Sequence, residues 1–168
     1  MKRLPLLLLL TVMIGGCGRT SSDVQTAASG LWQAQLLGGE SPADGFSFTA
    51  QFNVSGAGGA LTFPSGGFQF LTQGPCFPVN GITPTGDMNL TVNTNNYEVT
   101  GTFTMAVVAN GNTLTLSGNV TGNENSLYGL TLSNGLVTGT WTLAGSNTDG
   151  CVDTSGSFSM TQASSGTT

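Results

Sequence analysis

The chain has 168 residues and a formal net charge of −5, and it contains no histidine and only three basic residues, Lys2, Arg3 and Arg19. This composition excludes nucleic acid as a partner, because binding phosphate requires clustered Lys and Arg. It also excludes catalytic Ser–His, Cys–His and Ser–Lys pairs in the part of the chain after Arg19. Paired carboxylates are the remaining acid–base option, and no spacing places two of them across a cleft. We therefore expect a non-enzymatic protein without catalytic residues.

The first seventeen residues have the three-part layout of an export signal. Met1–Arg3 is positively charged, Leu4–Ile14 is an apolar run, and the small residues Gly15 and Gly16 precede Cys17. The apolar run is about half of the roughly 20 residues that a membrane-spanning helix needs. We predict a signal peptide over residues 1–16.

The residues Ile14-Gly15-Gly16-Cys17 resemble the lipobox of bacterial lipoproteins. The resemblance implies a lipid on the Cys17 thiol, cleavage before Cys17, and acylation of the new amine by a fatty acid such as palmitate. By the same resemblance, Gly18 after the cysteine indicates the outer membrane in a cell that has one. The implied location is the bacterial cell envelope, with the membrane as a partner through the lipid anchor. The alternative is an ordinary secretory signal cut near an unrelated cysteine.

After cleavage the chain would contain one arginine and eight acidic residues, which gives a net charge of about −7. With Cys17 committed to lipid, two cysteines remain, Cys76 and Cys151, in an oxidising compartment. We predict a Cys76–Cys151 disulfide, which would constrain the unfolded chain by about 4 kcal/mol. Two free thiols are the alternative.

Both ends of the mature chain are composed of small polar residues without periodicity. Residues 17–29 are predicted to be a lipidated flexible tether, and residues 163–168 a disordered tail. The part between them, residues 30–162, is long enough for a single domain with a sizeable core.

That domain is dominated by alternation of apolar and polar residues, which is typical of strands with one buried face. Asn- and Gly-rich turns separate the strands and indicate that neighbours in sequence pair in space. Residues 55–86 hold four prolines and break the pattern, with short strands expected near 60–63 and 67–71. We predict an all-β fold, an antiparallel up-and-down meander that closes into a small β-barrel of about 8–10 strands. Closure is favoured because no Lys guards an edge; a two-sheet β-sandwich is the alternative. The alternating segments are 32–36, 46–54, 88–92, 97–107, 114–120, 137–143 and 158–160.

The tripeptide Gly30-Leu31-Trp32 opens the first predicted strand and resembles the signature of lipocalins and calycins. The resemblance implies an up-and-down barrel whose mouth holds a small apolar ligand. The chain departs from the family in having no Arg or Lys in its last strand and no visible C-terminal helix. The candidate residues for the barrel interior and for lining a ligand are Trp32, Phe48, Phe103 and Trp141.

No metal or cofactor is expected. Asn147, Asp149 and Asp153 could offer oxygen ligands to Ca²⁺, but their spacing is not that of a calcium loop and they are interpreted as solvated turn residues. Three roles remain open. The first is a structural or protein-interaction role in the envelope, the second is a carrier of a small apolar ligand, and the third is inhibition of a secreted enzyme through the loop 72–86.

Overall fold

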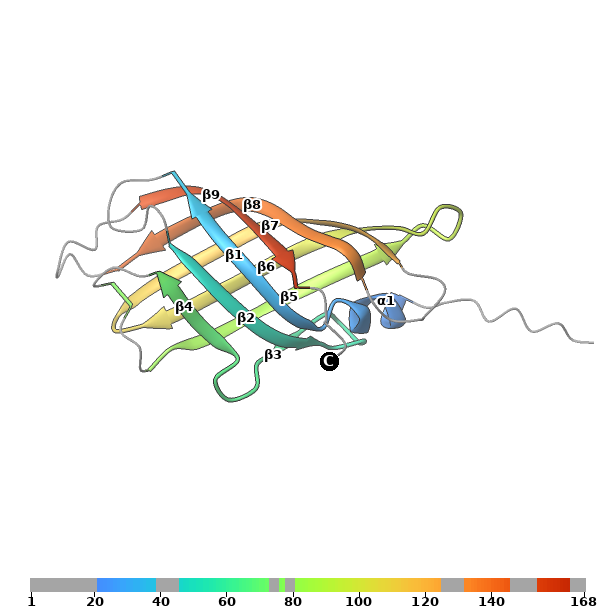
Figure 1. The fold of residues 1–168 in the computed structure, drawn as a ribbon. Coiled ribbons are helices and arrows are strands. Elements are labelled where there is room, and N and C mark those ends of the chain that lie inside the picture. The colour runs from blue at the N-terminus through green and yellow to red at the C-terminus, as the bar shows by residue number, and fades with distance from the viewer. Residues whose placement is uncertain are drawn as a thin grey trace, which may run out of the picture.

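The computed structural model describes residues 21–38, 46–72, 76–77, 81–124, 132–145 and 154–163. These residues form one short helix and nine antiparallel strands (Figure 1). In chain order the elements are α1 (Ser21–Ala27), β1 (Gly30–Leu37), β2 (Ser47–Val54), β3 (Leu61–Thr62), β4 (Phe68–Thr72), β5 (Thr83–Val92), β6 (Glu98–Ala109), β7 (Asn112–Glu124), β8 (Leu132–Ala144) and β9 (Thr154–Gln162).

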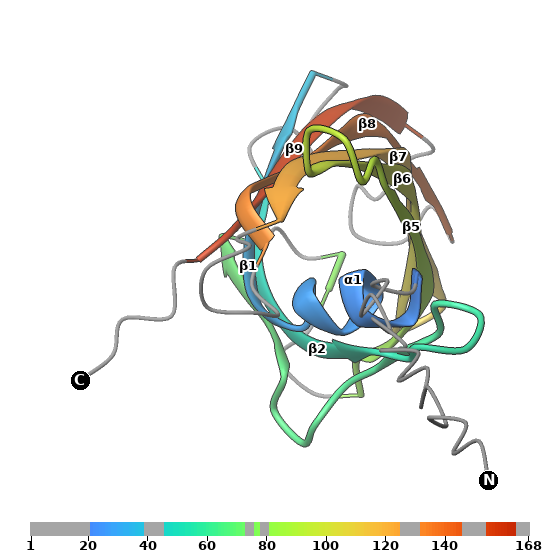
Figure 2. The same cartoon turned by 90° about the vertical axis from the view of Figure 1, so that its right-hand side faces the viewer.

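The strands form one sheet that curves round until its first and last long strands meet. The order across the sheet is β3-β2-β1-β9-β8-β7-β6-β5, and β4 also pairs with β2. From β5 to β9 each strand pairs with the next one in the chain, and β9 then pairs with β1. Seen end on in Figure 2, the strands surround a common axis. The fold is the predicted all-β, up-and-down barrel, nearly closed, and the sandwich alternative is wrong.

Alternation along each strand sends apolar side chains inward and polar side chains outward. In β6, Val99, Phe103 and Met105 are buried, whereas Thr100 and Thr102 between them are exposed. The same period of two runs through β1, β2, β7 and β9, as a sheet with one wetted face requires. The barrel interior is therefore built by the residues that the sequence pattern marks as apolar.

A row of four residues shows how large side chains fit inside. Phe103 in β6 lies opposite Gly118 in β7, and Gly139 in β8 lies opposite Phe158 in β9. The two glycines face each other across the β7–β8 ladder. Neighbouring strands are about 4.8 Å apart, so three steps across the sheet cover about 14 Å. The two phenylalanine ring centroids are nevertheless only 6.2 Å apart, because the glycines leave room for the rings above them.

Helix α1 lies at one end of the barrel, within the ring of strands in Figure 2. Val24 and Ala28 are buried at 1% and 0% exposure, and the Trp32 indole Nε1–H donates to the Ala28 carbonyl at 2.9 Å. The Gln162 amide donates to the carbonyls of Ala27 and Ser29 at 3.3 and 3.1 Å.

This packing differs from the flexible tether predicted for residues 17–29. Residues 21–29 are ordered against the barrel, and residues 17–20 lie outside the described part of the chain. A two-turn helix is not stable by itself in water, so its order comes from burial and from the three hydrogen bonds to Trp32 and Gln162. Within the described ranges, no helix has the length and apolar character of a membrane span.

The opposite end of the barrel is closed by aromatic packing. Phe77 is fully buried, with its ring centroid 5.8 Å from that of Phe46 and 4.8 Å from that of Phe70. The neighbouring Cys76 carbonyl accepts a hydrogen bond from the Asn112 side chain at 2.8 Å. Cys76 and Phe77 both fall in the predicted loop 72–86. At least residues 76 and 77 of that loop belong to the core.

The paired glycines under the phenylalanine rings give a test of interior packing. A Cβ at Gly139 would lie 2.5 Å from the Gly118 Cα and would also meet the Ser117 carbonyl. We expect Gly139→Val to lower the free energy of unfolding by about 3 kcal/mol, because an overpacked core must shift its backbone. Thr140→Val, on the exposed face of the same strand, should change it by less than about 0.5 kcal/mol. Urea denaturation measures both, and equal effects would contradict this packing.

Candidate functional site

The four residues predicted to line the barrel interior are all inside it. Trp32, Phe48, Phe103 and Trp141 each have 0% exposure. The Trp32 ring stacks on that of Phe52, with centroids 6.0 Å apart, and the Trp141 Nε1–H donates to the Leu37 carbonyl at 3.2 Å. These side chains are held by protein contacts on all sides, so they act as core residues.

Three hollows that open to solvent are formed by the described residues, and none of these four aromatic side chains lines any of them. The hollows lie along the outside of the barrel wall. The open surface among the described residues is therefore on the outside of the barrel, and two of the three hollows differ clearly in their lining.

The first is the seam where the barrel wall is incomplete. β4 pairs with β2, β5 pairs with β6, and no strand ladder among the described residues joins β4 to β5. Among the described residues, one isolated bridge, between Ala60 and Asp87, crosses this gap. Beside that bridge, the Met88 N–H donates to the Gly59 carbonyl at 2.8 Å.

A groove of about 810 Å³ follows this seam, and we call it the seam groove. Phe63, Phe68 and Ile82 are half-buried there, each packed against the core on one side. The lining contains no charged residue. Its members are Leu61, Thr62, Phe63, Pro64, Ser65, Gly66, Gly67, Phe68, Gly81, Ile82, Thr83 and Pro84.

The two edges of the seam differ in hydrogen-bonding capacity. In an antiparallel strand the N–H and C=O of one residue point to the same side, and successive residues alternate. The Gln51 N–H bonds the Gly67 carbonyl, so Gly67 and Gln69 face β2. Phe68 and Phe70 therefore turn their N–H and C=O groups to the open side. The β4 edge offers both donors and acceptors.

By the same reasoning, the β5 edge has fewer backbone groups available for hydrogen bonding. The bond from the Met88 N–H to β3 shows that Met88, and with it Gly86 and Pro84, face the seam. Proline has no N–H, so β5 cannot donate at position 84. The seam thus has one edge that can pair with a further strand and one that is blocked at Pro84.

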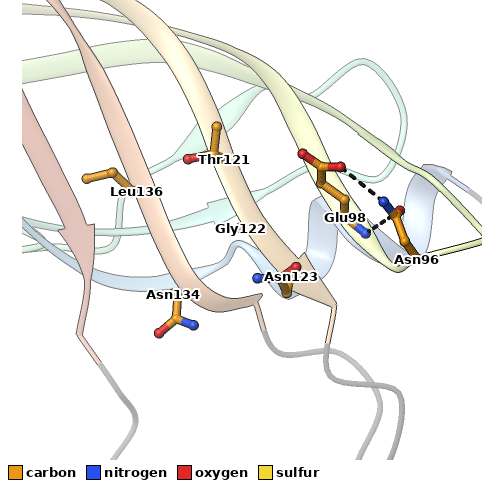
Figure 3. A pocket seen from close by; sticks show the side chains of 7 residues that line it. All are labelled: Asn96, Glu98, Thr121, Gly122, Asn123, Asn134 and Leu136. Carbon is orange, nitrogen blue, oxygen red and sulfur yellow. Dashed lines mark hydrogen bonds between the residues drawn. The ribbon is translucent and has the colours of Figure 1, made fainter.

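The second hollow, about 290 Å³, lies on the outer face of β6, β7 and β8 (Figure 3). The Asn96 amide donates to Glu98 Oε2 at 3.2 Å, and the Glu98 N–H donates to Asn96 Oδ1 at 3.2 Å. These bonds fix the Glu98 side chain beside the turn. The remaining lining residues are Thr121, Gly122, Asn123, Asn134 and Leu136.

Glu98 is the single carboxylate of this polar hollow, so the hollow has no acid–base pair. Across the described ranges, no group of three or more His, Cys, Asp or Glu residues could hold a metal ion. The lining of this hollow offers amide and hydroxyl groups for hydrogen bonding, together with the Glu98 carboxylate.

Several residues singled out by the sequence lie outside the described residues. They are Cys17, Cys151, Asn147, Asp149 and Asp153. Cys76 is described and is fully buried, and its pairing with Cys151 stays a prediction. Comparison with protein families, with curated proteins and with solved structures finds no match to this chain.

The seam groove was missed because its parts look unrelated in the sequence. Pro64 and Pro84 mark its two walls, and both fall in the stretch 55–86 where the strand pattern breaks. That break was interpreted as two short strands followed by a loop, without an open edge between them. An interrupted strand facing a proline-containing strand is the signal that could have indicated an open edge.

The single bridge across the seam can be tested with two adjacent glycines of similar conformation. Gly58 and Gly59 have φ angles of 85° and 71°, but a Cβ at Gly59 would lie 2.7 Å from Asn89 Oδ1, whereas a Cβ at Gly58 meets nothing within 4 Å. We expect Gly58→Ala to cost about 1 kcal/mol of stability from its backbone alone. Gly59→Ala should cost about 3 kcal/mol because the bridge is also displaced. Thermal or urea unfolding that gives equal losses would show that the bridge does not hold the seam.

Proposed function

We propose that this protein is a non-enzymatic lipoprotein of the bacterial envelope, anchored through lipid on Cys17, whose barrel acts by contact with another protein. The observation that carries the proposal is the filled interior. Trp32, Phe48, Phe103 and Trp141 occupy the space where a carrier would hold its ligand. The hollows that remain among the described residues lie outside the barrel wall, where a macromolecule has access to them.

Lipid attachment accounts for membrane binding by a domain without positive charge. None of the described residues is Lys or Arg, so attraction to anionic headgroups contributes nothing there. Each CH₂ of an acyl chain buried in the bilayer supplies about 0.8 kcal/mol. Several acyl groups on one cysteine are sufficient for stable anchoring.

Because α1 is folded against the barrel, only a short segment separates Cys17 from the folded domain. Cys17 lies four residues before Ser21, where α1 begins. Four extended residues span at most about 14 Å. In the anchored protein the α1 end of the barrel would therefore lie beside the membrane, and the opposite end, with Phe77, would point away from it.

The Cys76–Cys151 disulfide belongs to this proposal. Cys76 is fully buried at the end away from α1, and β9 begins there at Thr154, opposite Leu143. Cys151 precedes β9 by three residues, which is compatible with a link between the Phe77 segment and the last strand. An oxidising compartment favours that link.

A carrier of a small apolar ligand is the alternative, and the packing argues against it. The aromatic interior would have to move apart to admit an acyl chain, at the cost of its contacts. No observation on the described residues favours this role.

The anchor is tested by comparing the native protein with Cys17→Ser expressed in its bacterial host. We expect the native protein in the membrane fraction with acyl chains in its intact mass, and Cys17→Ser in the soluble fraction as an unacylated chain. The purified Cys17→Ser protein should show no saturable binding of a fluorescent fatty acid. Membrane retention of the variant would contradict the anchor, and stoichiometric fatty-acid binding would contradict the filled interior.

A further inference from the structure

We propose that the seam groove is a strand-addition site, where the free edge of β4 pairs with an extended segment of another protein. That segment alternates apolar and polar residues and carries basic residues at its flanks. The inference rests on the proposed function, since it specifies the kind of partner that the barrel contacts.

Backbone geometry selects β4 as the pairing edge. Phe68 and Phe70 direct their N–H and C=O groups into the seam, and no strand among the described residues pairs with them. The facing β5 edge lacks a donor at Pro84. An added strand would therefore form its ladder with β4, because β5 offers a carbonyl acceptor but no N–H donor at Pro84. Strand addition of this kind gains its affinity from main-chain hydrogen bonds.

Side chains on one face of the added strand would enter the groove. Phe63, Phe68 and Ile82 present apolar surface there that is only half-buried. On the outer face, Leu71 is 56% exposed, the highest value among the large apolar side chains found exposed. Alternating apolar residues in a partner would cover the groove surface, and pockets for alternate side chains are what give strand addition its specificity.

The absence of edge protection is unusual for a strand in this position. Natural edge strands are blunted by charges, especially Lys, or by proline. β4 has the sequence Phe-Gln-Phe-Leu-Thr and carries neither, whereas Pro84 protects β5. One side of the seam is thus guarded against pairing and the other is left available.

The negative charge of the protein indicates that the segment bound in the seam groove is basic. Asp87 is exposed at the bridge that ends the seam, the chain carries a formal net charge of −5, and none of the described residues is Lys or Arg. A basic segment is attracted by this field, since charge complementarity raises the rate and selectivity of association. A second copy of the chain brings no positive charge from its own described residues. The field therefore favours a different, basic partner over self-association.

The position of the seam fits an anchored protein. β4 runs from Phe68 toward Thr72, away from the α1 end of the barrel. If Cys17 holds the α1 end at the membrane, the open edge of β4 extends away from the lipid and is accessible to a soluble or envelope partner.

The test uses a synthetic probe, the heptapeptide Lys-Val-Thr-Val-Thr-Val-Lys with a fluorescent label, titrated by anisotropy into the full-length Cys17→Ser protein. Two further peptides carry N-methyl groups on the three Val amides or on the two Thr amides. Alternate amides point to opposite edges of a strand, so one set should be needed for pairing with β4. We expect methylation of that set to weaken binding at least tenfold and methylation of the other set to weaken it less than threefold. Parent-like binding by both methylated peptides, or no binding by the parent, would overturn the proposal.

A matched pair of protein variants separates pairing from general charge. Leu71→Lys places a guard on the open edge, and Val108→Lys makes the same charge change at an exposed residue of β6, which is paired on both sides. We expect at least a tenfold loss of peptide affinity in the first and less than a twofold loss in the second, with unchanged circular dichroism in both. Equal losses of peptide affinity in the two variants would show that charge alone governs binding, and would overturn strand addition.

Sedimentation of the same proteins examines self-pairing. The protein should be monomeric at micromolar concentration. A dimer that Leu71→Lys dissociates would make a second copy the occupant and overturn the choice of a basic partner. Membrane fractionation with Cys17 intact is independent of these measurements, so failure of peptide binding leaves the lipid anchor and the filled interior standing.

Discussion

The structure depends on the pairing of β1 with β9, which joins the two ends of the meander. Six residues of each strand are in register, from Trp32 opposite Gln162 to Leu37 opposite Ser157. Without this ladder the chain would present two long edges with no lysine to protect them, a condition that promotes aggregation. The β1–β9 ladder thus stabilises the barrel. It also covers two strand edges that would otherwise be open to pairing with other molecules.

The same ladder positions α1. Because Trp32 and Gln162 lie opposite each other, their side-chain N–H groups reach the carbonyls of residues 27–29 together. The helix occupies that end of the barrel, and Phe77 with its aromatic neighbours occupies the other. Between them the ring pair of Phe103 and Phe158 spans the two glycines of the wall. The inward side chains of the described strands are buried along the length of the barrel.

Much of the fold was predictable because burial follows a period of two along most of the chain. The pattern Tyr97–Val107, for example, matches the burial of β6, and the short strands expected near 60–63 and 67–71 correspond to β3 and β4. The barrel followed from the lack of edge protection. All four aromatic residues chosen for the interior are there, although as core side chains and not beside any hollow found among the described residues.

Two features could not be derived from local pattern. Helix α1 has seven residues of low periodicity, and its order comes from burial and from hydrogen bonds to Trp32 and Gln162, which are far apart in the chain. The seam depends on which side of β4 and β5 each backbone group faces, and that is decided by single bonds such as Gln51 to Gly67 and Met88 to Gly59. Such bonds are part of the tertiary structure. Their effect on a strand edge cannot be predicted from the residues of that strand alone.

Among the described residues, backbone pairing closes the barrel except at the seam between β4 and β5. Hydrogen–deuterium exchange, resolved to single amides by NMR, tests it most directly. We predict slow exchange at the amides that pair β1 with β9, and exchange at least about 100-fold faster at Phe68 and Phe70, whose N–H groups face the seam. Equal protection of Phe68, Phe70 and the β1–β9 ladder would contradict the account, because the seam would then be closed by pairing.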